Sequence, residues 1–219
     1  MKPIPPLARV LYRLLTRVFT LDVTWLMVLD RELANTASSG CQADVTCRLL
    51  TPRDVEIYSV LTDSELTPEI ANRLRGGIDF CVGVFVAGEL ASYAWFALES
   101  IEAEQNRGAH PASGVGFTFP SHMAFMYKGY TLPDFRGRGL YRELPRAAFE
   151  LLSSHGVTAI LSTADWSNAA ALASCTRLGF HPIGRVWVGG MRNVVWQKHP
   201  TSTRVYGIAR TPHHANANR

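Results

Sequence analysis

The chain has 219 residues, of which 47% are hydrophobic and 18% charged. This balance is enough to build a buried core, and it excludes the intrinsically disordered, collagen-like and coiled-coil classes. The net charge of +4 is too small by itself to indicate nucleic-acid binding. Its distribution is uneven, because the segment from Arg136 to the end carries 11 basic and 3 acidic residues, against 11 and 15 before it. Such a localised positive field suits an anionic ligand.

Residues 7–18 have the pattern of a short basic amphipathic helix. Apolar side chains recur at helical spacing, while Arg9, Arg13 and Arg17 recur every fourth residue on another face. Two interpretations stay open: a helix packed on the domain, or one lying on an anionic membrane surface. The N-terminus does not resemble a signal peptide, because the arginines interrupt its apolar run. No apolar stretch of the sequence is as long as a membrane span. A cytoplasmic protein is therefore predicted, with peripheral membrane attachment as the alternative.

A change of composition near residue 45 predicts the domain boundary. Residues 21–29 read as a strand and residues 34–44 as a linker. We therefore expect residues 1–44 to be an appendage of helix, strand and linker. The main domain is expected over residues 45–199, followed by a flexible tail over residues 200–219. The four cysteines show no CxxC spacing, so neither a zinc cluster nor a disulfide framework is predicted.

Strands and helices alternate through the first half of the main domain. Two Thr-Pro pairs place an N-cap before a proline at the first helical position and so predict helix starts. Apolar runs on either side of Ala87-Gly88-Glu89 predict a hairpin. Segment 99–121 has no period, and a loop of this length is either functional or disordered. The expected elements are a strand over 45–50, helices over 51–62 and 67–75, and strands over 80–86 and 90–98.

The second half continues the alternation. Gly156 and Gly179 are expected to end two helices, and Gly189-Gly190 to form the turn of a closing hairpin. Pro145 lies inside the first of these helices, where it would remove a hydrogen bond, so we expect a bend there. The expected elements are a strand over 122–132, a helix over 139–155, a strand over 157–163, a helix over 168–178, and strands over 180–189 and 191–198.

The most informative stretch joins the strand 122–132 to the following helix and reads Arg136-Gly137-Arg138-Gly139. Glycines let the backbone approach a ligand closely, and the first turn of a helix offers unpaired N–H groups at a positive dipole end. Guanidinium groups have a geometry suited to phosphate. Basic glycine-rich turns also occur as plain surface loops, and neither a Walker A nor a dinucleotide-binding pattern is present. The turn predicts an anion site.

This turn resembles the [QR]-x-x-G-x-[GA] signature of the acyl-CoA-dependent N-acyltransferase superfamily called GNAT, which follows a strand that often ends in proline. Arg136, Gly139 and Pro133 match the signature. Tyr141 stands where the family has Gly or Ala. An outward side chain would leave its N–H able to donate, whereas an inward one would alter the phosphate site and weaken the assignment. Later in the chain, Asn168, a helix and Gly179-Phe180 resemble the family's next motif. The resemblance covers about residues 45–198 in element order, with motif detail only over 130–181.

The resemblance implies a mixed α/β fold, with a central, mostly antiparallel sheet flanked by helices. Strands 122–132 and 157–163 would be splayed around the thioester of acetyl-CoA or another acyl-CoA. The backbone N–H groups of the turn would hold the pyrophosphate, and the end of the preceding strand would pair with the pantetheine arm. Asn168 would cap its helix and also bond the pantetheine. The expected cofactor-binding residues are Tyr130, Thr131, Leu132, Arg136, Gly137, Arg138, Gly139, Leu140, Tyr141 and Asn168.

Acetyl transfer to an amine needs a neutral amine and a proton for the departing thiolate. The family commonly places a tyrosine proton donor four residues before the glycine of Gly-Phe, and here that position is Cys175. A thiol can donate a proton, but a cysteine on the apolar face of a helix is more often a small core residue, which is the interpretation we favour for Cys175. The thiolate would then leave unaided, or Ser174 or a water would be the donor. As general base, His122 has a suitable intrinsic pKa although it stands at the far end of its strand. Glu99 and Glu102 are alternatives.

Together these features predict a cytoplasmic N-acetyltransferase that transfers acetyl from acetyl-CoA to a primary amine of a small molecule, sugar or peptide. One alternative is a non-catalytic acyl-CoA-binding or sensing domain, suggested by the missing tyrosine and the absence of an obvious base. Another is a membrane-peripheral acyltransferase acting on a cell-envelope precursor, suggested by residues 7–18. We expect no metal and no nucleic-acid partner, since CoA phosphates account for the positive charge. A homodimer stays open.

Overall fold

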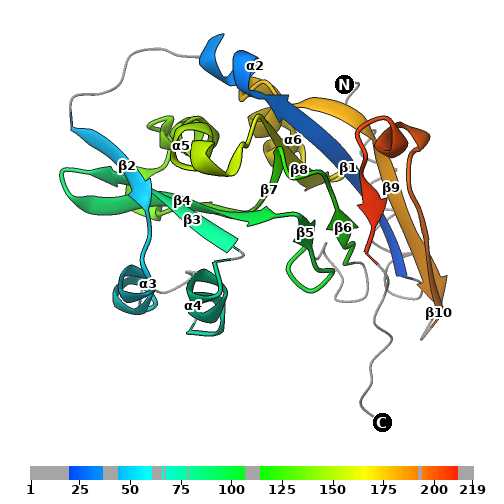
Figure 1. Cartoon of the computed structure of the whole chain (residues 1–219), viewed down its shortest axis with the longest axis horizontal. Coiled ribbons are helices and arrows are strands. Elements are labelled where there is room, and N and C mark those ends of the chain that lie inside the picture. Colours follow the sequence, from blue (N-terminus) through cyan, green and yellow to red (C-terminus); the bar gives the residue numbers. More distant parts are fainter. Residues whose placement is uncertain are drawn as a thin grey trace. The chain divides into compact units, whose positions relative to one another are not determined.

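Apolar, β-rich runs form the strands of the computed structural model, as the sequence predicts, and helices alternate with them along the chain (Figure 1). The structure describes residues 20–36, 44–60, 66, 68–77, 79–106, 114–191 and 194–211. The predicted helix over 7–18 and the linker residue Cys41 therefore lie outside the described residues. The chain divides into two compact units. Unit 1 takes its residues from 1–28, 99–120 and 162–219, and unit 2 from 29–98 and 121–161.

Unit 2 contains four strands in the order β7-β4-β3-β2, and each neighbouring pair is antiparallel. Helix α5 lies on one face of these strands, and helices α3 and α4 lie on the other (Figure 1). Because both faces are covered, β3 and β4 are almost continuously buried. The strands are β2 (Val45–Leu49), β3 (Asp79–Val86), β4 (Glu89–Leu98) and β7 (Met123–Thr131).

The hairpin predicted between β3 and β4 is confirmed. Its two turn residues, Ala87 and Gly88, have φ values of 51° and 85°. Positive φ at both central residues gives the turn a twist that matches the twist of the flanking strands. The hairpin brings Asp79, at the start of β3, opposite Ala97 near the end of β4.

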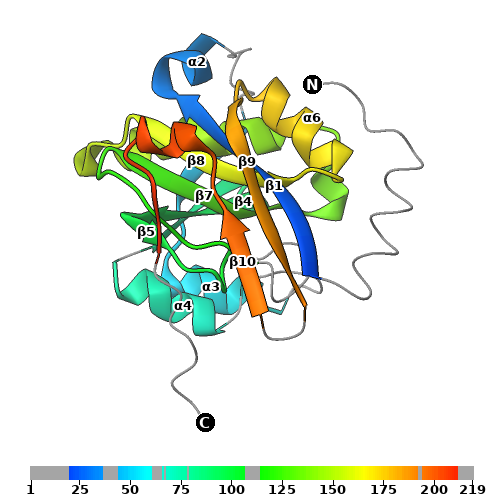
Figure 2. The same cartoon turned by 90° about the vertical axis from the view of Figure 1, so that its right-hand side faces the viewer.

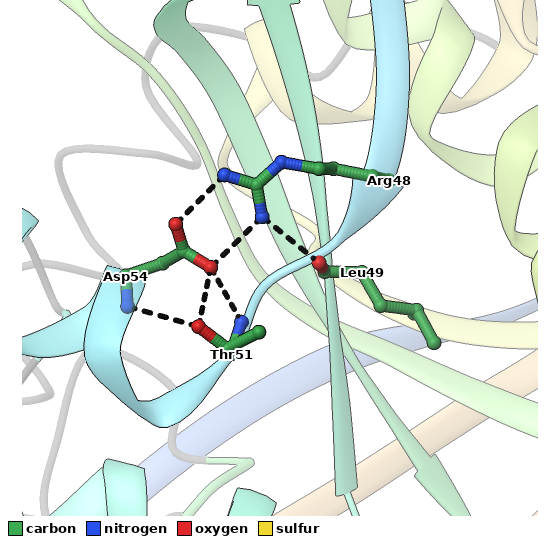
Figure 3. A network of polar contacts seen from close by, with 4 residues as sticks. All are labelled: Arg48, Leu49, Thr51 and Asp54. Carbon is green, nitrogen blue, oxygen red and sulfur yellow. Dashed lines mark hydrogen bonds and ion pairs between the residues drawn. The ribbon is translucent and has the colours of Figure 1, made fainter.

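Helix α3 (Pro52–Tyr58) begins with a capping box. The Thr51 hydroxyl accepts from the N–H of Asp54 at 3.2 Å, and the Asp54 carboxylate accepts from the N–H of Thr51 at 2.7 Å. Arg48, near the end of β2, donates to both oxygens of that carboxylate at 2.7 and 2.8 Å, and to the carbonyl of Leu49 at 3.2 Å (Figure 3). One carboxylate therefore caps the helix and joins it to the preceding strand.

The prediction of a helix as far as residue 62 is wrong in its length. Helix α3 ends at Tyr58, and the N–H of Ser59 closes the last turn on the carbonyl of Val55. The second predicted helix is confirmed as α4 (Pro68–Arg75). Unit 2 also contains α2 (Arg31–Thr36), whose first residue donates from its guanidinium to the carbonyl of Phe149 at 2.7 Å.

The helix after the glycine-rich turn begins later than predicted. A 3₁₀ turn occupies Leu140–Arg142, and α5 runs over Glu143–Leu151. Pro145 is therefore the third residue of the α-helix, where the N–H that proline lacks would have no partner within the helix. The predicted start of the helix is wrong, and the hydrogen bond whose loss predicted the bend is not needed there. Gly156, with φ 72°, ends a further 3₁₀ turn after α5.

Unit 1 contains the strands β10, β9 and β1 side by side and antiparallel (Figure 2). Their bounds are β1 (Thr20–Asp30), β9 (His181–Met191) and β10 (Val194–Lys198). The glycines predicted to form the hairpin turn lie inside β9 instead. Gly189 faces Leu21 on one side and Trp196 on the other. A Cβ at Gly189 would overlap the Trp196 ring, so this glycine makes room for an indole rather than for a turn.

The segment predicted as a loop over 99–121 contributes two short strands of unit 1, β5 and β6. Together with β11, from near the end of the chain, they form a second sheet in the order β11-β6-β5. Thr203 and Ile208, from the segment expected to be a flexible tail, are buried, and the segment is ordered at least as far as Thr211. These strands are β5 (Ser100–Ile101), β6 (Phe117–Thr118) and β11 (Ala209–Arg210).

Candidate functional site

The glycine-rich turn connects β7 to α5 within unit 2. Gly137 and Gly139 have φ values of 77° and 74°, which L-residues with a side chain rarely adopt. The N–H groups of Gly137, Arg138 and Gly139 donate to no backbone carbonyl of the described residues, and all three residues are exposed. A Cβ at Gly137 would meet no atom within 4 Å. Consecutive exposed N–H groups just before a helix start suit an anion.

Two arginines supply charge to this turn. Arg136 folds back on β7, where its Nε donates to the carbonyl of Thr131 at 3.0 Å and its terminal nitrogen donates to the hydroxyl of Tyr130 at 3.2 Å. Arg138 lies over the ring of Phe135, 5.6 Å from the ring centroid. Both arginines are exposed. The turn therefore combines free N–H donors with two guanidinium groups, as phosphate recognition requires.

The side chain of Tyr141 points toward β7 and not outward. Its ring lies against Gly129 of β7, where a Cβ would overlap the hydroxyl oxygen and approach a ring carbon to 2.7 Å. Gly129 thus makes room for the tyrosine. The side chain is half-buried on the strand. This is not the outward arrangement that would leave the family's phosphate site unaltered, although Gly137, Arg138 and Gly139 are exposed.

A β-bulge interrupts β7 next to this contact. Tyr130 faces Tyr93 and Tyr127 faces Trp95, so Lys128 and Gly129 together stand opposite one residue of β4. Lys128 has φ 47°, a strained conformation for a residue with a long side chain. A bulge leaves backbone groups of the strand without ladder partners. The sequence shows no signal for this bulge except the glycine.

A buried carboxylate lies beside the bulge, and the sequence analysis missed it. Asp79 is fully buried, and its Oδ2 accepts from the hydroxyl of Tyr127 at 2.6 Å and from Nε of Arg73 in α4. Burial and the charge of Asp79 raise the pKa of the Tyr127 phenol far above its usual value, so the phenol stays a donor. Hydrogen bonding to Asp79 raises the pKa of Arg73. The Oδ1 of Asp79 has no partner among the described residues.

The sequence analysis looked for a carboxylate on the strand expected over 122–132, whereas Asp79 lies on β3. Residues 122–132 contain no carboxylate, whereas Asp79 reaches Tyr127 across the width of β4. The one available signal was an acidic residue at the start of an otherwise apolar run, which is unusual for a buried strand.

The remaining predicted site residues divide between the two units. Asn168 and Cys175 belong to unit 1, and His122 belongs to unit 2, as the turn does. The Asn168 side chain accepts from the N–H of Ala171 at 3.0 Å and caps α6 (Ala169–Arg177), as predicted. Burial raises the pKa of the Cys175 thiol to about 11. His122 is exposed and precedes the bulge at Lys128 by six residues, about 20 Å of strand, so the geometry gives no support for it as general base.

Among the described residues, no three or more His, Cys, Asp and Glu residues form a group that would hold a metal ion. No helix within the described ranges has the length and apolar character to cross a membrane.

The family described as "Acetyltransferase (GNAT) family" matches residues 57–180, more than half of the chain. No curated protein matches the chain. A putative GNAT acetyltransferase from Novosphingobium aromaticivorans is similar in structure, with 21% identity, TM-score 0.51, and 84% of this chain and 68% of that chain covered. A conserved protein of unknown function from Staphylococcus epidermidis has 14% identity, TM-score 0.53, and 88% and 69% coverage.

A tandem GNAT protein from the clavulanic acid biosynthesis pathway has 14% identity and TM-score 0.54, with 91% of this chain and 61% of that chain covered. These identities show a shared fold and leave the substrate open. The mixed α/β architecture, with its mostly antiparallel strands and flanking helices, agrees with that fold. The family match is independent of these structures and covers the strand, turn and helix described above. The chain belongs to the GNAT family of acetyltransferases.

Proposed function

We propose that the chain transfers an acetyl group from acetyl-CoA to a primary amine by direct attack of the amine on the thioester. The turn at residues 136–139 carries this proposal. It offers three backbone N–H groups without backbone partners and two exposed guanidinium groups, which match the pyrophosphate of an acyl-CoA. Family membership supplies the reaction class. The acceptor is proposed only as an amine of a small molecule or peptide.

The residues of the turn fit the cofactor chemically. Gly137 and Gly139 leave the backbone uncovered, so that phosphate oxygens can reach the N–H groups. Glu143, in the first turn of α5, carries a charge that would repel an anion, but it is paired with Arg142 at 3.4 Å and with Arg146 at 3.1 Å. In this proposal the end of β7 pairs with the pantetheine arm.

The bulge in β7 suggests how the chain favours the reaction. Backbone groups of the bulge at Gly129, which is exposed, can hydrogen-bond a polarised carbonyl. Fixed backbone dipoles of this kind stabilise developing negative charge without having to reorganise. No side chain among the described residues is assigned here as general base, and positioning of the two reactants supplies much of the rate.

Gly139→Trp tests the site, because a large side chain at a left-handed position would cover the N–H groups. We expect the affinity for acetyl-CoA, measured by calorimetry, to fall at least 100-fold. Gly156→Trp is the matched control, since Gly156 has the same left-handed φ of 72°, is exposed and has open space around it. It should keep the affinity within twofold and lose similar thermal stability.

The outcomes separate the functions considered. Micromolar binding of acetyl-CoA together with acetylation of a member of an amine panel supports the enzyme. Binding without turnover across the panel would favour a non-catalytic acyl-CoA-binding or sensing domain. Failure of the unmodified chain to bind any acyl-CoA, or equal affinity in Gly139→Trp, would rule out this site.

A further inference from the structure

The bulge in β7 is strained, so its neighbours must hold it. A lysine with φ 47° stays in that conformation only where the surroundings fix the chain on both sides. After the bulge, the Ser92 hydroxyl donates to the carbonyl of Tyr130 at 2.8 Å, and the Tyr141 ring covers Gly129. Before the bulge, the fixed point is Tyr127.

Tyr127 is fixed at both ends of its side chain. Its ring is buried against Trp95, with ring centroids 6.4 Å apart. Its hydroxyl donates to Oδ2 of Asp79 at 2.6 Å, and the same oxygen accepts from Arg73. A hydrogen bond to a buried carboxylate is stronger than one between neutral groups. The carboxylate belongs to β3 and the guanidinium to α4, so three elements meet at the residue that precedes Lys128.

We infer that Asp79 is a positioning residue for acetyl transfer: through Tyr127 it holds the bulge at Lys128 and Gly129 in the orientation that the thioester carbonyl requires, and through Arg73 it ties this orientation to α4. This inference rests on the proposed function. The turn at 136–139 is held by other contacts, among them those of Arg136 with Tyr130 and Thr131. Loss of the Asp79 anchor therefore disturbs turnover and leaves cofactor binding intact.

Tyr127→Phe tests the inference with little risk to the fold, because it removes the hydroxyl and keeps the ring. We expect kcat to fall at least 10-fold, while the KM and the calorimetric Kd for acetyl-CoA stay within twofold. Amide hydrogen exchange in the paired stretch of β7 before the bulge, residues 124–127, should accelerate at least 10-fold, since the hydroxyl no longer anchors the strand. Arg75→Leu is the control on the same helix, because Arg75 pairs with exposed Glu56, and it should change none of these quantities.

Substitutions of Asp79 separate positioning from plain stability. An asparagine can still accept from the tyrosine hydroxyl, whereas a leucine cannot. Asp79→Asn should therefore retain more of the exchange protection and of kcat than Asp79→Leu. Wild-type exchange and kcat in Tyr127→Phe would overturn the inference, as would equal kcat values for the two Asp79 variants. If the unmodified chain neither binds nor turns over acetyl-CoA, the proposed function fails, and the exchange measurements alone still decide whether Asp79 holds the bulge.

Discussion

Single residues in this chain carry more than one structural task, and Asp54 is the clearest case. Its carboxylate caps α3 through Thr51 and pairs with Arg48 at the end of β2 (Figure 3). The hydrogen bond from Arg48 lowers the pKa of Asp54 well below its usual value, against the opposing effect of partial burial. A folded-state pKa below the unfolded value of about 3.9 stabilises the fold above that pH, and the contribution is lost as the pH falls through the folded pKa.

We therefore expect Asp54→Asn to lower the free energy of unfolding by about 1 kcal/mol at pH 7. The deficit should begin to shrink below about pH 4, because the carboxyl of the unfolded wild-type chain then takes up a proton while the folded one stays ionised. Urea denaturation of both proteins at pH 7, 5 and 3.5 measures it. Glu56→Gln is the control, since this carboxylate and its partner Arg75 are both more than half exposed, at 59% and 51%. A deficit independent of pH would contradict the role assigned to the charge.

Cys175 stands where the family commonly has a proton-donating tyrosine, and its environment argues against the same task. Burial raises its pKa to about 11, above that of an ordinary thiol. Transfer of its proton to a departing thiolate is therefore uphill. We expect Cys175→Ala to keep kcat within threefold at pH 7.5 in a steady-state acetylation assay. A 100-fold loss with unchanged thermal stability would restore Cys175 as the donor.

At the level of elements, Gly189 shows how a strand can depend on the absence of a side chain. It lies inside β9 opposite Trp196 of β10, and the indole occupies the space that a Cβ would take. We expect Gly189→Ala to lower the free energy of unfolding by about 1–3 kcal/mol through overpacking. In a Trp196→Ala background the same change should cost less than about 0.5 kcal/mol, because the obstacle is gone and alanine is less flexible than glycine. Urea denaturation of all four proteins tests this, and additive effects would show that the ring is not the obstacle.

The elements that the sequence predicted well are those with local signals. The alternating apolar runs, the Thr51 cap and the Asn168 cap each depend on residues that are only a few positions apart in the chain, and the structure confirms them. What escaped prediction depends on pairing across strands. The contact of Tyr127 with Asp79 joins residues 48 positions apart, and the role of Gly189 depends on its register with Trp196. The effect of Pro145 depends instead on where α5 begins, because a proline near a helix start looks alike in sequence whether or not its N–H is needed.

On the scale of the whole molecule, the uneven charge of the sequence acquires a partial explanation. The segment from Arg136 to the end has a net charge of +8, against −4 for the remainder. Two of its arginines, Arg136 and Arg138, belong to the turn, whose N–H groups at residues 137–139 donate to no backbone carbonyl of the described residues. A positive field around an anion site raises both affinity and encounter rate, and dissolved salt screens it over a Debye length of about 10 Å at 0.1 M.

The affinity for acetyl-CoA should therefore depend on salt through the turn. We expect the Kd to rise about fivefold between 50 and 300 mM KCl, because the phosphates and the arginines are exposed to the screening ions. Arg138→Gln should weaken binding at 50 mM and flatten the salt dependence, whereas Arg53→Gln, which removes the same charge from exposed α3, should do neither. Acetyl-pantetheine, which lacks the pyrophosphate, should show no salt dependence with any of the three proteins. Calorimetric titration at four salt concentrations measures these slopes. Equal slopes for the wild type and Arg138→Gln would mean that the phosphates bind away from this turn, and the positive charge would then serve the protein as a whole.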